Sequence, residues 1–128
     1  MQPIQLFEMA SRQAEWLSVR QEVVAGNIAN ANTPKYKAKD VSPFDAVLEQ
    51  TYVPMARTHA SHFAANNISD EVEIKESELN EEIGVQESGN TVSLSDELSK
   101  TGEIKRQYEL STGLVKSFHS MMLMIVKR

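Results

Sequence analysis

The chain contains no cysteine, and among its 128 residues it has few glycines, prolines and aromatic residues. Without a thiol it can form neither a disulfide nor a thiolate metal site. No segment approaches the ~20 consecutive apolar residues that a helix needs to cross a bilayer. The opening residues, MQPIQLFE, have neither the basic nor the apolar region of a signal peptide. We therefore expect no membrane span and no cleaved signal peptide.

Acidic residues outnumber basic ones, giving a net charge of −5 and a pI near 5.2. A net negative charge argues against non-specific binding to nucleic acid or to anionic lipid. The acid is also localised, because eight carboxylates and one lysine lie between Asp70 and Glu87, a local charge of −7 that leaves +2 elsewhere. Such a stretch is usually a solvated face or loop. The alternative is a surface that repels wrong neighbours.

Apolar residues near the N-terminus follow the alternating spacing of three and four that is typical of a coiled-coil helix. The pattern predicts a helix over residues 1–32. Pro34 prevents continuation, and it favours an extended conformation for Thr33. Three asparagines crowd this end, where short polar side chains can cap a helix. The seam consists of Phe7, Ala10, Ala14, Leu17, Val24, Ile28 and Ala31, with Gln21 as the interruption.

The middle of the chain, residues 33–93, lacks the helical spacing of apolar residues. Its prolines follow one another too closely for a long helix, although Phe44 to Gln50 is compatible with one or two helical turns. Val72 and Ile74 alternate with glutamates, which indicates a short half-buried strand. Ile83 and Val85 are its candidate hairpin partners. We expect an irregular acidic segment that is either partly disordered or contains short β-strands.

A second long helix is predicted over residues 94–128, with Ser95 and acidic residues near its start. It carries two apolar rows. The first row consists of Ile104, Tyr108, Ser111, Val115, Phe118, Met122 and Ile125, and the second of Leu110, Leu114, Met121 and Met124.

The fold class that these patterns predict is mainly α, with the two terminal helices paired as an antiparallel, coiled-coil-like hairpin forming one domain. A pair of helices cannot cover both rows of the C-terminal helix, so one row needs another protein. The predicted assembly interface comprises Phe7, Ala10, Ala14, Leu17, Val24, Ile28, Ile104, Tyr108, Leu110, Leu114, Val115, Phe118, Met121, Met122, Met124 and Ile125.

No pattern of catalytic or metal-binding residues stands out in the sequence. His59 and His62 are three residues apart, but a metal site needs three or four ligands, and the sequence offers neither a third histidine nearby nor a thiolate. The glycines are scattered, and no serine lies in a Gly-x-Ser-x-Gly context. We predict no catalytic residue, no metal, no cofactor and no small-molecule substrate. An enzyme that uses the histidine pair is disfavoured because no substrate pocket is apparent.

The end of the first helix, Asn27-Ile28-Ala29-Asn30-Ala31-Asn32-Thr33-Pro34 followed by Tyr36 and Lys37, resembles the signature of the flagellar axial proteins of rod and hook. The resemblance covers residues 1–44 and about 88–128, and it is loose in the acidic middle. Position 35 is lysine where the family pattern usually has glycine, so the turn needs a conformation that a Cβ tolerates. The motif and helix-stop residues are Asn27, Ala29, Asn30, Asn32, Thr33, Pro34 and Tyr36.

This resemblance implies a structural component of the proximal rod, exported by the flagellar type III system without signal cleavage and assembled helically in the periplasm. Such a rod connects the MS ring and export gate to the distal rod, and it transmits torque around the export channel. The implied partners are other proximal rod subunits, further copies of the chain, the MS ring–rod junction protein and the export gate. The alternatives are another small flagellar axial protein, or a coiled-coil adaptor or export chaperone.

Overall fold

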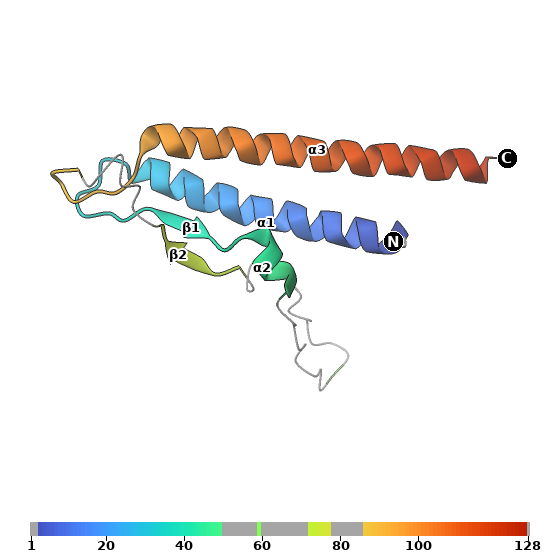
Figure 1. Cartoon of the computed structure of the whole chain (residues 1–128), viewed down its shortest axis with the longest axis horizontal. Helices are drawn as coiled ribbons and strands as arrows, with labels where there is room; N and C mark the ends of the chain where they lie inside the picture. Colours follow the sequence, from blue (N-terminus) through green and yellow to red (C-terminus); the bar gives the residue numbers. More distant parts are fainter. Residues whose placement is uncertain (1–2, 50–58, 60–71, 78–85, 128) are drawn as a thin grey trace.

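The computed structural model describes residues 3–49, 59, 72–77 and 86–127 of the chain. Two long helices, α1 (Pro3–Ala29) and α3 (Leu94–Val126), lie side by side and run in opposite directions (Figure 1). The mainly helical fold that the apolar spacing predicts is therefore confirmed. Neither these helices nor any other in the described ranges is long and apolar enough to cross a membrane.

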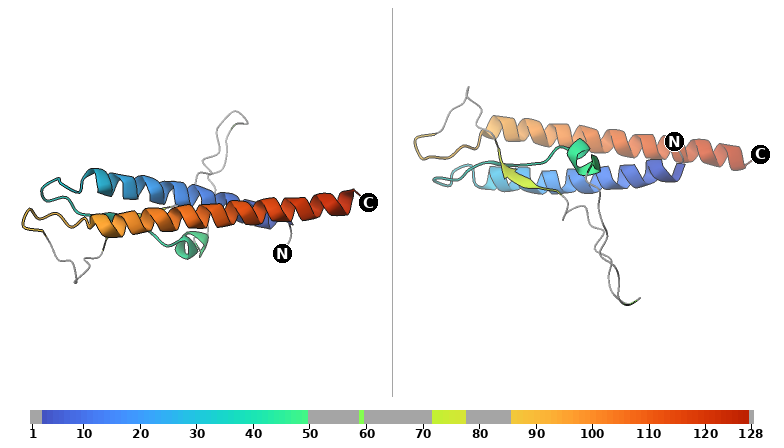
Figure 2. Two further views of the ribbon diagram at one scale, coloured as in Figure 1. Left: turned by 90° about the horizontal axis from the view of Figure 1, so that it is seen from above. Right: turned by 60° about the horizontal axis from the view of Figure 1, so that its bottom comes forward.

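Three short elements connect the long helices. After α1 the chain turns back along it as β1 (Lys39–Val41) and then forms α2 (Phe44–Glu49), as the views in Figures 1 and 2 agree. A second strand, β2 (Ile74–Glu76), pairs antiparallel with β1. The register places Lys39 opposite Glu76 and Val41 opposite Ile74.

The predicted strand around Ile74 is present, but its burial and its partner differ from expectation. Val72 is buried, whereas Ile74 is 51% exposed. The alternation fails because Val72 precedes the strand, so the pleat does not place the two residues on one face. The observed partner of β2 is β1, and the predicted partners Ile83 and Val85 lie outside the described residues.

The apolar core is built around α1, which packs on two sides. One side faces α3, and the other faces the segment that contains β1 and α2. Trp16 belongs to the second side: its ring lies 5.7 Å from that of Phe44, and its Nε1–H donates to the Ser42 carbonyl at 2.9 Å. The buried cluster consists of Trp16, Leu17, Val24, Val47, Val72 and Ile104.

The burial of α3 is uneven along its length. Its first part buries Glu97 and Ile104. With 33 residues against 27 in α1, it extends past the start of that helix (Figures 1 and 2). Beyond Tyr108 its large apolar side chains are mostly exposed, and this end of α3 therefore lacks a complete partner within the described chain.

Candidate functional site

Asn27, the first asparagine of the motif, is fully buried inside the last turns of α1. Its Oδ1 accepts from the backbone N–H of Lys39 at 3.0 Å, and its Nδ2 donates to the carbonyl of the same residue at 2.7 Å. The same Nδ2 also donates to Glu97 Oε2 at 3.0 Å. One amide therefore joins α1, β1 and α3, so the role of Asn27 extends well beyond ending the helix.

Glu97 continues this network, which we call the polar clamp: Asn27, Asp40, Glu97 and Lys100. The Glu97 side chain is 3% exposed, and its Oε1 accepts from Lys100 Nζ at 3.1 Å. The same ammonium lies 3.1 Å from Asp40 Oδ2. Burial lowers the pKa of Lys100, but hydrogen bonds and charge from Glu97 and Asp40 outweigh it and raise the pKa above its ordinary 10.5. The clamp therefore places one ammonium between two carboxylates.

Replacing Lys100 with glutamine should give a stability difference that depends on pH. Because the folded pKa is raised, the ammonium contributes its full stabilisation below the unfolded pKa of 10.5, and the contribution is lost as pH rises through the folded value. Urea unfolding followed by circular dichroism should show the wild type more stable than Lys100→Gln at pH 8, with the gap closing above pH ~10.5. Ser99→Ala, which changes an uncharged exposed neighbour on α3, should show no such closing gap. A gap that is constant with pH would contradict the prediction.

The turn after α1 is held by a second buried asparagine, Asn90, which lies in the segment before α3. Its Nδ2 lies 2.9 Å from the carbonyls of Asn30 and Ala31 and 2.8 Å from that of Thr33. Its Oδ1 accepts from the Val92 N–H at 2.7 Å. These carbonyls belong to the turn that follows α1, and the residue that pairs with them lies four positions before the start of α3.

The remaining motif residues lie around this cap. Asn30 Nδ2 donates to the Gly26 carbonyl at 2.8 Å, and the Thr33 hydroxyl donates to Asn30 Oδ1 at 3.1 Å. Tyr36 is half-buried, and its carbonyl accepts from the Thr91 N–H at 3.1 Å. The exit from α1 is therefore tied to the segment before α3. Ala29, Asn32, Thr33 and Pro34 are exposed.

Lys35 adopts the left-handed conformation, with φ of 61°, where the family pattern usually has glycine. A side chain in this conformation costs about 1–2 kcal/mol. Lys35→Gly should therefore raise the free energy of unfolding by about 1 kcal/mol, measured by urea denaturation. The same change at Lys37, an exposed neighbour without positive φ, should lower it. Equal effects at both positions would show that the strain at Lys35 is negligible.

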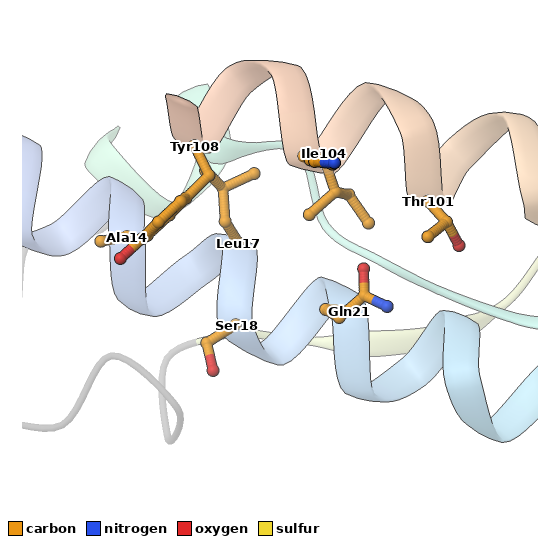
Figure 3. A pocket seen from close by; sticks show the side chains of 8 residues that line it. Ala14, Leu17, Ser18, Gln21, Thr101, Ile104 and Tyr108 are labelled. Carbon is orange, nitrogen blue, oxygen red and sulfur yellow. The ribbon is translucent and has the colours of Figure 1, made fainter. Parts of the chain in front are cut away.

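The predicted seam brings α1 and α3 together over most of its length. At one end the rings of Phe7 and Phe118 meet edge to face at 5.9 Å. Further along, Tyr108 lies against Ala14, and Ile104 points between the helices toward α1 (Figure 3). Small α1 residues leave a groove of about 450 Å³ here, and a second groove of about 260 Å³ shares Ala14 and Tyr108 with it.

The predicted interface residues therefore separate into three groups. Leu17, Val24 and Ile104 are buried within the chain. Phe7, Ala10, Ala14, Ile28, Val115, Phe118 and Met122 are half-buried along the seam. Tyr108, Leu110, Leu114, Met121, Met124 and Ile125 are exposed, the last at 76%.

Sequence reasoning missed the buried roles of Trp16, Asn90 and Glu97. Gly89-Asn90 was recognisable as a turn, and Glu97 as an acid in the first turn of a helix. No local sequence pattern identifies Asn90 or Glu97 as the partner of a residue about 60 or 70 positions away. Trp16 lies one residue outside the seam, so the heptad pattern excludes it.

Comparison with known proteins adds independent evidence. The family model described as flagella basal body rod protein matches residues 15–37, which contain the second half of α1 and the motif. A flagellar basal body rod protein FlgB from Agrobacterium fabrum is 65% identical over 130 residues, covering 100% of this chain and 97% of its own. The FlgB of Escherichia coli K12 is 33% identical over 72% of this chain and 71% of its own, and that of Aeromonas hydrophila 32% over 86% and 83%.

The helical hairpin, the motif at its turn and these relatives together define a flagellar rod protein, a structural component of the basal body. Histidine chemistry plays no part in this assignment: His59 is exposed, and His62 lies outside the described residues. Within the rod proteins, the chain belongs to the FlgB family.

Proposed function

We propose that the chain assembles helically with other subunits of the proximal rod in the periplasm, and that the exposed second row of α3 is the surface through which it does so. This row, Leu110, Leu114, Met121 and Met124, is 47–68% exposed in the single chain. Each such side chain contributes about 1.5–3 kcal/mol when fully buried. An exposed apolar row of this kind, interrupted at Ser117, is typical of a protein–protein contact.

The polar clamp and the Asn90 cap suit the mechanical part of this proposal. A rod that transmits torque needs subunits whose elements do not slide against one another. Asn27 joins α1, β1 and α3 through one buried amide. Asn90 joins the turn after α1 to the segment before α3. Buried hydrogen bonds of this kind define one arrangement, because each alternative leaves a polar group unpaired.

The expected neighbours are further copies of the chain, other proximal rod subunits, the MS ring–rod junction protein and the export gate. We also propose export through the flagellar type III system without signal cleavage. The relatives named above are all described as rod proteins, which favours these partners over those of a coiled-coil adaptor or an export chaperone.

The test is a double substitution in the second row, Leu114→Ser with Met124→Ser. The variant should be exported at the normal level but should be absent from purified basal bodies, and the cells should not swim. Immunoblots of periplasmic and basal-body fractions measure both steps. Neither side chain is buried, so the purified chain should keep its stability within about 0.5 kcal/mol.

A matched control changes two exposed serines of the same helix, Ser99→Ala with Ser120→Ala. This variant should enter the rod normally. Normal incorporation and swimming of the second-row variant would contradict the proposed surface.

A further inference from the structure

One face of the helix pair carries a groove that is distinct from the second row of α3. The open groove, as we call it, is lined by Ala14, Leu17, Ser18, Ile104 and Tyr108 (Figure 3) and by Lys105, among others. It continues past Ala10, Ser11 and Thr112. Trp16, which contacts the segment containing β1 and α2, is two residues from Ser18 and so about 200° around α1. The groove therefore opens on the side of α1 away from that segment.

The rim of the open groove is acidic along α1. Glu8, Glu15 and Glu22 are exposed and recur every seven residues, which places them in one line along the helix. Glu15 is four residues after Ser11 and three before Ser18, so this line borders the groove. An occupant should therefore be apolar on the inside and should carry no negative charge at its edge.

The second row of α3 has these properties. From Leu110 to Lys127 the helix contains no carboxylate and carries lysines at 116 and 127. The row runs from Leu110 to Met124, and the groove runs from Phe7 to Gln21 on α1. Each covers fourteen helical steps, or about 21 Å. Length, polarity and the charge along the α1 rim therefore match, while Lys105 on the α3 side of the groove lies 3.9 Å from the Glu109 carboxylate.

The two surfaces lie on opposite sides of α3. Leu114 is two residues from the groove residue Thr112, which turns it about 200° around the helix. A chain whose donor and acceptor surfaces point in opposite directions cannot satisfy both in a closed pair. Repetition of such a head-to-tail contact gives a ring where the rotation between copies closes and an open helix where it does not.

We infer that the second row of α3 in one copy of this chain docks into the open groove of a neighbouring copy, with the basic end of α3 facing the acidic rim. This inference rests on the proposed rod function and specifies which surfaces of adjacent copies meet. The contact extends the apolar seam from two helices to three. It also covers Tyr108, which is 53% exposed in the single chain.

The absence of cysteine allows a direct test by disulfide trapping. One tagged copy carries Ser18→Cys in the groove, and a second copy with another tag carries Ser117→Cys. Ser117 is three residues after Leu114 and four before Met121, so it lies in line with the row, and both serines are exposed. The two are co-expressed in place of the native chain, and isolated basal bodies are oxidised. A disulfide-linked dimer with both tags should form. Neither variant alone should give it, and Ser99→Cys should not replace Ser117→Cys.

A charge variant tests the same contact without a new thiol. Glu15→Lys in the copy with Ser18→Cys should lower the yield of the mixed dimer, because the groove then repels the basic end of α3. Glu49→Lys, which changes an exposed acid on α2 away from the groove, should leave the yield unchanged.

The same blots separate this inference from the rod role on which it rests. The groove contact would be wrong if copies enter basal bodies but Ser18→Cys and Ser117→Cys form no mixed dimer. It would also be wrong if Ser99→Cys forms the mixed dimer in place of Ser117→Cys. Either result would leave the rod role unaffected. Absence of the unmodified chain from basal bodies would overturn both.

Discussion

Asn27→Ala should destabilise the folded chain by about 3 kcal/mol. The substitution removes three hydrogen bonds at a fully buried position, two to the backbone of Lys39 and one to Glu97. Leaving buried groups without partners costs about 1–3 kcal/mol each, and entry of water recovers part of that. Trp16, the single tryptophan, is buried in the core, so its fluorescence in a urea titration reports the loss.

Asn32→Ala is the matched control, because it makes the same chemical change five residues later in the same motif. Asn32 is exposed, so its loss should change the free energy of unfolding by no more than about 0.5 kcal/mol. Equal effects of the two substitutions would show that the polar clamp contributes nothing beyond an ordinary surface amide. Normal incorporation of Asn27→Ala into rods, despite the loss of stability, would separate the clamp from assembly.

Asn90→Asp should be at least as damaging, although it changes the shape of the side chain very little. The amide nitrogen that donates to the carbonyls of Asn30, Ala31 and Thr33 becomes an oxygen that repels them. The other oxygen keeps the Val92 N–H, but a buried carboxylate with one oxygen against three carbonyls is strongly disfavoured. We expect a loss of about 3–5 kcal/mol at pH 7, again measured by urea denaturation with Trp16 fluorescence.

The pH dependence of this variant provides the internal check. Burial beside carbonyls raises the pKa of the new carboxyl above its ordinary ~3.9, because the neutral form can donate one hydrogen bond. The deficit should therefore be smallest below pH ~4, should grow as pH rises from there toward the folded pKa, and should level off above it. Asn90→Ala should show a smaller loss with no such dependence. A pH-independent deficit in Asn90→Asp would mean that the new side chain leaves the cap and reaches water.

Both predictions concern the motif at the end of α1, because Asn27 belongs to it and Asn90 pairs with its carbonyls. The density of asparagine in this motif suggests a series of helix caps. In the structure Asn30 has a local role, with its amide donating back to Gly26. Asn27 instead pairs with the backbone of β1, and Asn90 pairs with the carbonyls of the turn that follows the helix. The motif thus joins the end of α1 to the start of α3, which holds the hairpin together at its closed end.

Much of the fold follows from local patterns. The alternating spacing from Phe7 to Ile28 predicts α1, and that from Ile104 to Ile125 predicts α3, because a helix places residues three and four apart on one face. Pro34 predicts the stop. The middle segment was less predictable: alternation of Val72 and Ile74 indicates a strand but does not identify β1 as its partner.

One part of the candidate site can be predicted from local patterns, and the other part cannot. The exposed second row of α3 is visible as an apolar row that one partner helix cannot cover, and burial separates it from the seam. The polar clamp is not visible, since the spacing between Asn27 and Glu97 carries no periodic signal. Glu97 reads as a favourable acid in a first helical turn, and its burial follows from what α1 and β1 place around it.

Local patterns in the chain are enough to predict two long amphipathic helices, the turn after α1 and the excess of apolar surface on α3, because each depends on residues within a few turns of one another. Tertiary packing is needed to establish that Trp16 faces inward, that Asn27 and Asn90 are buried connectors, and that the open groove and the second row lie on opposite sides. These features depend on how separate elements pack. Local spacing does not specify which distant carbonyl or carboxylate a side-chain amide will meet.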